Sequence, residues 1–292
     1  MTTAWVFPGQ GSQSVGMEGN LFDTSLGRER SRAAEKILGW SVSEKCRSDE
    51  ETLSRTLYTQ PCLFVIESIL TDLCLEKGLS PDFVAGHSLG EYSALYAARV
   101  FDFESGLHLV QNRARLMDSA AGGKMAALMK FDRSQLESVV QETGNVVIAN
   151  DNSPEQVVIS GTPDAVDEVL GRVKAKRAVP LKVSGAFHSP LMENAAREFQ
   201  RILDLVTFDN ATVPVLSNVD PDRPTQDAEE IKDYLVRQMT NSVRWREIAG
   251  KLSDIGVKKA IEIGPGKVLT GLIKRTCPDM ELENIDPATI GE

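Results

Sequence analysis

The pentapeptide Gly86-His87-Ser88-Leu89-Gly90 has the residue types and spacing of a serine nucleophile. An apolar run over residues 83–85 precedes it, and a run typical of a helix over 91–98 follows it. A strand, a sharp turn and a helix in this order form a nucleophile elbow, which exposes the serine hydroxyl. The flanking glycines fit because such a turn leaves little room for neighbouring Cβ atoms. Gly and Ser are also common in ordinary turns, so the catalytic interpretation depends on the strand and helix around the pentapeptide.

A serine hydroxyl needs a base within hydrogen-bond reach, and the chain has three histidines. His87 is adjacent to Ser88, and neighbouring side chains on a tight turn diverge. His108 lies near the polar side of a predicted helix over 103–118, where a surface histidine is expected. By elimination, His188 is the base. No Asp or Glu presents itself as a third member, so a backbone carbonyl or an amide side chain would fix the tautomer of His188.

Two glycine-rich loops are candidates for nucleotide sites. Loop 9–14 resembles the start of a dinucleotide fingerprint, but its sixth position is Ser14 in place of glycine. Loop 264–268 lacks the spacing of a phosphate loop. Neither loop supports nucleotide binding. The first follows a predicted strand and could supply a backbone N–H to an oxyanion hole; a simple strand-to-helix turn is the alternative.

Arg113 is a candidate for binding an anion. On the predicted helix 103–118 it lies roughly 80° from the centre of the apolar stripe, whereas Arg115 lies roughly 120° away. Arg113 is therefore expected to be half-buried, and a buried arginine needs an anionic partner. The alternative, a surface ion pair, is favoured by helix position alone.

The composition is that of a globular protein: 292 residues, 41% hydrophobic and 25% charged. No signal peptide and no membrane-spanning run is recognisable. The net charge of −10 argues against nucleic acid as a partner. Four scattered cysteines indicate a reducing compartment and no zinc site. We expect a cytoplasmic protein, or an organelle-stroma protein if the source is a plastid, with no membrane partner and no metal.

The order of predicted elements gives an α/β protein of two parts. Residues 124–185 read as strand, helix, strand, strand, helix, strand, which is the ferredoxin-like pattern. Its strands are expected at 125–129, 145–149, 156–160 and 178–183, its helices at 133–142 and 163–174, and a turn at 150–154. Residues 1–123 and 186–292 would form the larger part, with strands at 3–7, 83–85 and 260–263 and helices at 59–77 and 103–118. The residues from about Pro278 onward are expected to be loose.

Taken together, the motifs resemble malonyl-CoA:acyl-carrier-protein transacylases over nearly the whole chain. Each motif alone is modest, and their number and order make the resemblance specific. The matching segments are 6–13, 60–61, 86–92, 113–117, 150–161, 186–189, 238–245 and 262–269.

The resemblance implies a large α/β-hydrolase-like subdomain and roles for particular residues. Ser88 would be the acylated nucleophile and His188 its base. The backbone N–H groups of Gln10 and Leu89 would form the oxyanion hole. Arg113 would bind the malonyl carboxylate, which reverses the interpretation of Arg113 as part of a surface ion pair. Gln238 would help to orient His188. Phe187 would select for malonyl, because its ring fills the space that a branching methyl group would need. Gly185 departs from the bulkier residue often found there. Asn150 and Asn152 match a family segment near the cleft but receive no role.

The implied activity is transfer of malonyl from malonyl-CoA to the phosphopantetheine thiol of holo acyl carrier protein, with no metal or bound cofactor. A chain of this length without a fused domain favours fatty acid biosynthesis, and we expect a monomer. Two alternatives remain: a serine esterase or thioesterase using the same elbow, and a non-catalytic scaffold that binds carrier protein. Because carrier proteins are acidic, one of two basic clusters would dock them. The clusters are Arg172, Lys174, Lys176, Arg177 and Lys182, and Lys258, Lys259, Lys267, Lys274 and Arg275.

Overall fold

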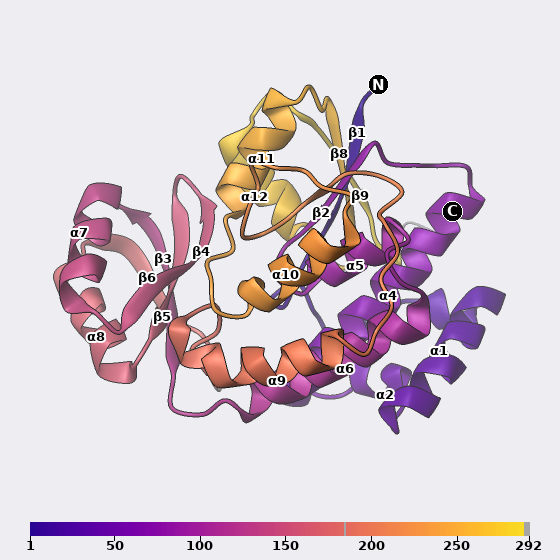
Figure 1. Ribbon diagram of the computed structural model, residues 1–292, viewed down its shortest axis with the longest axis horizontal. Helices are drawn as coiled ribbons and strands as arrows, with labels where there is room; N and C mark the ends of the chain where they lie inside the picture. The colour runs from indigo at the N-terminus through magenta and orange to yellow at the C-terminus, as the bar shows by residue number, and fades with distance from the viewer. Residues whose placement is uncertain (184, 289–292) are drawn as a thin grey trace.

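Two β-sheets organise the chain into a mixed α/β fold (Figure 1). The computed structural model describes residues 1–183 and 185–288. In the first sheet the strand order is β7-β2-β1-β8-β9 and every pairing is parallel. Its strands are β1 (Thr3–Phe7), β2 (Phe83–Gly86), β7 (Val215–Leu216), β8 (Lys259–Ile263) and β9 (Glu281–Ile285). The carboxyl ends of the parallel strands meet at one edge, where ligands bind in open α/β sheets.

Both faces of this sheet are buried. Along β1 the side chains alternate: Trp5 and Phe7 enter one apolar core, and Ala4 and Val6 enter the other. This alternation follows from the two-residue period of a strand. Burial on both faces gives β1 the nearly continuous apolar character of a central parallel strand.

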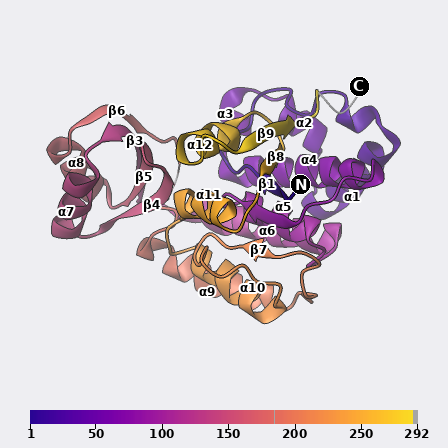
Figure 2. The same cartoon turned by 90° about the horizontal axis from the view of Figure 1, so that it is seen from above.

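Helices cover the two faces. Helices α11 and α12 pack over the core that contains Ala4 and Val6, and α4, α5 and α6 pack over the other (Figure 2). The helices of this part are α1 (Ser25–Leu38), α2 (Val42–Cys46), α3 (Glu50–Leu53), α4 (Thr56–Glu76), α5 (Gly90–Ala97), α6 (Phe103–Ser119), α9 (Glu193–Leu203), α10 (Ala228–Gln238), α11 (Trp245–Asp254) and α12 (Val268–Thr276), with short 3₁₀ turns η1 (Leu21–Asp23) and η2 (Pro190–Met192).

The second sheet is antiparallel, with the strand order β4-β5-β3-β6. Its strands are β3 (Lys124–Phe131), β4 (Val146–Ser153), β5 (Gln156–Gly161) and β6 (Ala175–Pro180). Helices α7 (Arg133–Thr143) and α8 (Pro163–Arg172) cover its outer face and enclose a separate apolar core (Figure 1). The chain enters and leaves this part side by side, because a Cβ on Gly123 would lie 2.1 Å from the backbone nitrogen of Ala186.

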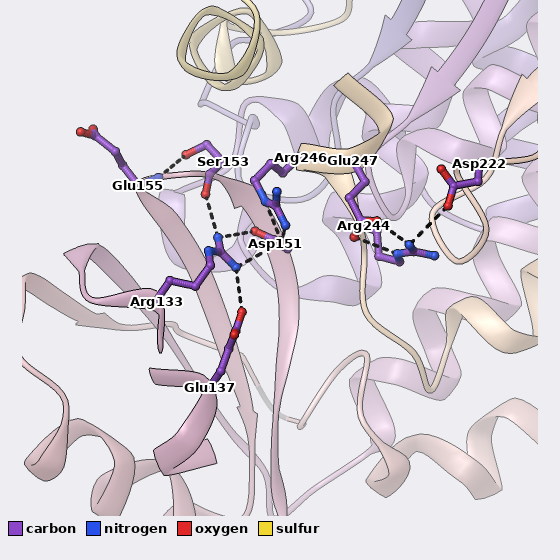
Figure 3. Close-up of polar contacts among 9 residues, drawn as sticks. All are labelled: Arg133, Glu137, Asp151, Ser153, Glu155, Asp222, Arg244, Arg246 and Glu247. Carbon is purple, nitrogen blue, oxygen red and sulfur yellow. Dashed lines mark hydrogen bonds and ion pairs between the residues drawn. The ribbon is translucent and has the colours of Figure 1, made fainter. Parts of the chain in front are cut away.

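Strand β4 fastens the second sheet to the rest of the molecule. The backbone N–H of Asp151 donates to the carbonyl of Val243 at 2.9 Å, and that of Val243 donates to the carbonyl of Ala149 at 2.8 Å. The Asp151 carboxylate lies between two guanidinium groups, at 2.9 Å from Arg133 and 2.8 Å from Arg246 (Figure 3). Because Arg246 belongs to α11, this ion pair crosses between the two parts.

Several sequence-based element predictions are wrong at their edges. The turn expected at 150–154 is largely strand, since β4 runs to Ser153 and is held there by Val243 and Arg246. Strand β6 spans 175–180 in place of 178–183, and α8 ends at Arg172 in place of Lys174. The segment after Pro278, expected to be loose, forms β9, which pairs in parallel with β8. Its alternating polar side chains suit an edge strand, and this pattern conceals it from a search for apolar runs.

In the described residues, no helix is both long and apolar enough to cross a membrane. The same residues contain no group of three or more His, Cys, Asp or Glu side chains that could hold a metal ion.

Candidate active site

Ser88 occupies a sharp turn between β2 and α5. Its φ of 53° lies in the left-handed region, which costs a non-glycine residue free energy. A Cβ on Gly86 would lie 1.9 Å from the backbone of Gly90, and one on Gly90 would lie 2.0 Å from the carbonyl oxygen of Phe7. Both flanking positions therefore require glycine. The turn presents Ser88 at the carboxyl edge of the parallel sheet.

Asn218, just after β7, holds the turn in this strained conformation. Its side-chain oxygen accepts from the backbone N–H of Ser88 at 2.7 Å, and its side-chain nitrogen donates to the carbonyl of Gly86 at 2.6 Å. Sequence reasoning missed Asn218, because β7 has only two residues and leaves no recognisable pattern.

His188 contacts the Ser88 hydroxyl. Its Nε2 lies 2.8 Å from Ser88 Oγ, and its Nδ1 lies 2.8 Å from the backbone carbonyl of Gln238. A carbonyl can only accept, so Nδ1 carries the proton and Nε2 is left to accept from Ser88. Burial, with a contribution from the Arg113 charge, lowers the pKa of His188 to about 3. The imidazole is therefore neutral at physiological pH and ready to act as a base.

Gln238, which was expected to orient His188, does lie beside it, but the contact is made by its backbone and not by its side chain. The backbone carbonyl of Gln238 contacts the imidazole, while its amide side chain contacts three other groups. The amide nitrogen donates to the Ser88 carbonyl at 3.0 Å and to Glu91 Oε2 at 2.6 Å. The amide oxygen accepts from Arg113 at 2.9 Å.

Arg113 is completely buried, at 0% exposure. The expectation that it would be half-buried is wrong. Helix α6 packs closely against α4, and the Arg113 side chain reaches the Ser88 hydroxyl inside the protein. Its guanidinium donates to Ser88 Oγ at 3.0 Å, to Gln60 Oε1 at 2.8 Å and to Gln238, and it lies over the Tyr92 ring. No carboxylate pairs with it directly among the described residues. Burial lowers the pKa of Arg113, but a guanidinium remains charged in proteins.

The two expected oxyanion donors lie near Ser88. Leu89 follows it in the turn, and Gln10 lies in the loop after β1 and lines a cavity that Ser88 also lines. The β1 loop is packed tightly against the elbow, since a Cβ on Gly9 would lie 2.3 Å from the carbonyl oxygen of His87.

His87 does not contact the Ser88 hydroxyl: its side chain contacts Asn152 Oδ1 at 2.8 Å. Asn152, which had no expected role, thus ties β4 to the elbow.

A cavity of about 370 Å³ opens at Ser88 between the two sheets. Phe187, 5% exposed, lies in its wall beside His188. Glycine is required at 185, because a Cβ there would lie 2.8 Å from the Ala120 carbonyl oxygen and 3.1 Å from the Phe187 ring. Much of the remaining wall is apolar, formed by Met117, Met125, Ala127, Val158, Val183, Leu269 and Leu272. A strained serine hydroxyl 2.8 Å from a neutral imidazole, with a fixed cation beside it in such a cavity, is suited to acyl transfer.

Comparison with known proteins agrees with this chemistry. Residues 4–291 match the acyl transferase domain family. The chain is 61% identical over 285 residues to the malonyl CoA-acyl carrier protein transacylase of Synechocystis sp., covering 98% of this chain and 97% of that protein. The crystal structure of the Synechocystis malonyl-CoA:ACP transacylase superposes with a TM-score of 0.96 at 60% identity, covering 98% and 97% of the two chains. A malonyl-transacylase in complex with its type II polyketide acyl carrier protein superposes with a TM-score of 0.92 at 37% identity, covering 98% and 96%.

The low pKa of His188 predicts that Ser88 stays reactive in mild acid. Because the folded-state pKa is about 3, the base form persists far below the ordinary histidine range near 6.5. The rate of labelling by a fluorophosphonate, measured by intact mass, should be flat from pH 5 to pH 8, and Ser88→Ala should not label. A rate that falls by half near pH 6.5 would contradict the burial argument.

Proposed function

The chain belongs to the acyl transferase domain family, and we propose that it transfers the malonyl group of malonyl-CoA to the phosphopantetheine thiol of acyl carrier protein. The observation that carries this proposal is the contact between Arg113 and the nucleophile. A permanent buried cation 3.0 Å from Ser88 Oγ can reach the carboxylate of a three-carbon acyl group attached to that oxygen. An esterase for neutral acyl groups has no use for such a charge, which is costly to bury without an anionic partner.

The proposed transfer has two halves. His188 Nε2 takes the Ser88 proton as the hydroxyl oxygen attacks the thioester carbonyl. The resulting oxyanion accepts from the backbone N–H groups of Gln10 and Leu89, and loss of one such donor typically costs about 3 kcal/mol. The tetrahedral intermediate collapses, the carbon–sulfur bond breaks, and His188 returns the proton to the departing coenzyme A thiolate. The carrier-protein thiol then attacks the malonyl-serine ester by the same steps in reverse, and no cofactor takes part.

We propose that Arg113 binds the malonyl carboxylate with two N–H groups, as guanidinium and carboxylate geometries allow. Phe187 then limits the acyl group by occupying the cavity wall beside the ester. Gln60 and Gln238 hold the guanidinium at a fixed place before substrate arrives. Neither amide carries a charge, so a carboxylate can displace one of them from Arg113 at small cost.

We also propose an α/β-hydrolase-like large subdomain, residues 1–123 and 186–292, with an inserted ferredoxin-like small subdomain, residues 124–185. Three facts support the division: separate sheets, a separate apolar core under α7 and α8, and the strand order of the second sheet. Numbered by their order in the chain, its strands lie in the spatial order second, third, first, fourth.

We also propose that the protein is a monomer, that it works in a reducing, cytoplasmic compartment, and that it supplies malonyl groups for fatty acid biosynthesis. The proposed site residues all belong to one chain, which supports a monomer, and the buried free thiols Cys46, Cys62 and Cys74 support a reducing compartment.

The docking surface for carrier protein is proposed to combine members of both basic clusters at the mouth of the cavity. Lys182 lines the cavity, Lys267 precedes lining residue Val268, and Arg275 reaches the lining residue Gln156 at 3.3 Å. All three are exposed. Figure 2 shows α12, which carries Arg275, on the side of the large sheet that faces the second sheet. Arg172 and Lys259 are poorer candidates because each already pairs with two glutamates.

Malonyl-CoA should leave a malonyl adduct on Ser88. Intact-mass measurement within seconds of mixing is expected to show one added malonyl group, with none in Ser88→Ala. Addition of holo carrier protein should remove the adduct and produce malonyl carrier protein. Rapid release of free malonate in its place would support the thioesterase alternative, and a wild-type protein that never acylates would support the scaffold.

Arg113→Ala should remove the preference for malonyl. We expect kcat/KM for malonyl-CoA to fall by about 100-fold, equivalent to about 3 kcal/mol, and that for acetyl-CoA to change little. Arg115→Ala, an exposed position on the same helix, is the matched control. Equal losses for both thioesters in Arg113→Ala would refute carboxylate binding by this residue.

Charge reversal at Lys182, Lys267 and Arg275 should slow transfer to carrier protein selectively. Enzyme acylated in advance would be offered holo carrier protein or free pantetheine, which is uncharged. Attractive charges at an interface mainly raise association rates, so the carrier-protein rate should fall about tenfold at low salt while the pantetheine rate holds. Reversal of the exposed Arg28, Lys36 and Arg201 on α1 and α9 is the control. An unchanged carrier-protein rate in the first variant would reject this surface.

A further inference from the structure

Glu91 is a buried carboxylate next to the catalytic residues, and the transfer described above does not use it. It lies on α5, three residues after Ser88, and is 2% exposed. Its Oε2 accepts from the Gln238 amide at 2.6 Å and from the backbone N–H of Asn218 at 3.3 Å, and the Ser217 hydroxyl also hydrogen-bonds the carboxyl group. The amide and the backbone N–H can only donate, and Oε2 can accept from both whether the carboxyl group is ionised or protonated.

A single amide links Glu91 to Arg113. The nitrogen of Gln238 donates to Glu91, and the oxygen of the same amide accepts from Arg113. A buried anion and a buried cation thus face each other across one polar group. Both charged groups are buried, so their attraction is screened much less than that of surface charges.

We propose that Glu91 sets the strength of substrate binding: its negative charge competes with the malonyl carboxylate for Arg113 and keeps the acyl group from binding too tightly. This inference rests on the proposed binding of malonyl by Arg113. Glu91 does not touch the substrate, so it is a positioning and specificity-tuning residue that acts through Gln238. Weak binding has a function here, because a group that Arg113 held too strongly on Ser88 would resist transfer to the second thiol.

The charge on Glu91 changes near neutral pH. Burial raises the pKa of Glu91 to about 7, against the opposing effects of its hydrogen bonds and of Arg113. The other ionisable groups around it stay fixed. The pKa of His188 is about 3, burial lowers the pKa of His87 and raises that of Tyr92, and Arg113 remains charged. At lower pH the Glu91 carboxylate is protonated and no longer competes for Arg113, so malonyl should bind more tightly at pH 6 than at pH 8.

The substitution Glu91→Gln would isolate the charge from the hydrogen bonds. The oxygen of the new amide can accept from Gln238 and Asn218 as Oε2 does now. Its nitrogen can donate to the Ser217 hydroxyl, which can accept as well as donate. Glu67→Gln is the matched control. Glu67 is also fully buried, but its neighbours are Ser93 and Glu262, so its substitution leaves the link from Gln238 to Arg113 in place.

The experiment measures the dissociation constants of malonyl-CoA and acetyl-CoA for Ser88→Ala, which cannot be acylated. Adding Glu91→Gln should tighten malonyl-CoA about tenfold at pH 8 and leave acetyl-CoA unchanged. From pH 6 to pH 8, the malonyl-CoA constant, divided by the acetyl-CoA constant, should rise several-fold with Glu91 present and stay flat in the Glu91→Gln variant. Calorimetry in two buffers should show proton uptake on malonyl-CoA binding only when Glu91 is present.

The outcomes separate the two proposals. Malonyl-CoA that binds no more tightly than acetyl-CoA at any pH would overturn carboxylate binding by Arg113 and this inference with it. A malonyl preference that is independent of both pH and Glu91→Gln would overturn this inference alone. The same holds if Glu91→Gln weakens both ligands equally, or if Glu67→Gln reproduces its effect. The pH series needs no substitution at position 91, so it decides the question even if that variant folds poorly.

Discussion

A permanent positive charge without access to water determines the arrangement around Ser88. Arg113 cannot lose its proton, so the fold must supply oxygen atoms around the guanidinium. Gln60, Gln238 and the Ser88 hydroxyl provide them, and Tyr92 offers its ring face. These groups come from α4, α10, the elbow and α5, so a single buried cation fixes the relative positions of four segments. A solvated arginine would impose no such order.

The parallel sheet makes this convergence possible. Loops after β1, β2 and β7 bring Gln10, Ser88 and Asn218 to one edge, because parallel strands all end on the same side. Close packing maintains the strained backbone at Ser88. Gly86 and Gly90 have no room for a Cβ, and the Asn218 side chain hydrogen-bonds the backbone of both Ser88 and Gly86. His188 also has a left-handed φ, of 57°, so both members of the pair occupy strained backbone that packed surroundings maintain.

The sequence predicts elements well where local pattern and burial agree. The first strand, the elbow and the start of α6 lie where the pattern puts them, since apolar runs bounded by glycine or a capping aspartate leave little choice. Prediction fails where partners distant in sequence decide. The strand character of 150–153 depends on Val243 and Arg246, and β9 depends on β8. Within the site, type and elimination pick out Ser88 and His188, whose side chains the structure brings together. The carbonyl that orients His188, and the links through Asn218 and Glu91, depend on tertiary geometry that no local pattern encodes.

The pairing of Ser88 with His188 spans 100 residues, and most of that span is the unit built around the second sheet. A flexible loop of this length would make the encounter of the two side chains entropically costly during folding. The second sheet forms from short-range antiparallel pairings and has its own core, and its entry and exit at Gly123 and Ala186 are in contact. Once folded, it acts as a short bridge in place of a long loop. Folding of this unit therefore shortens the chain segment that must close before His188 can contact Ser88, in addition to lining the cavity at Ser88.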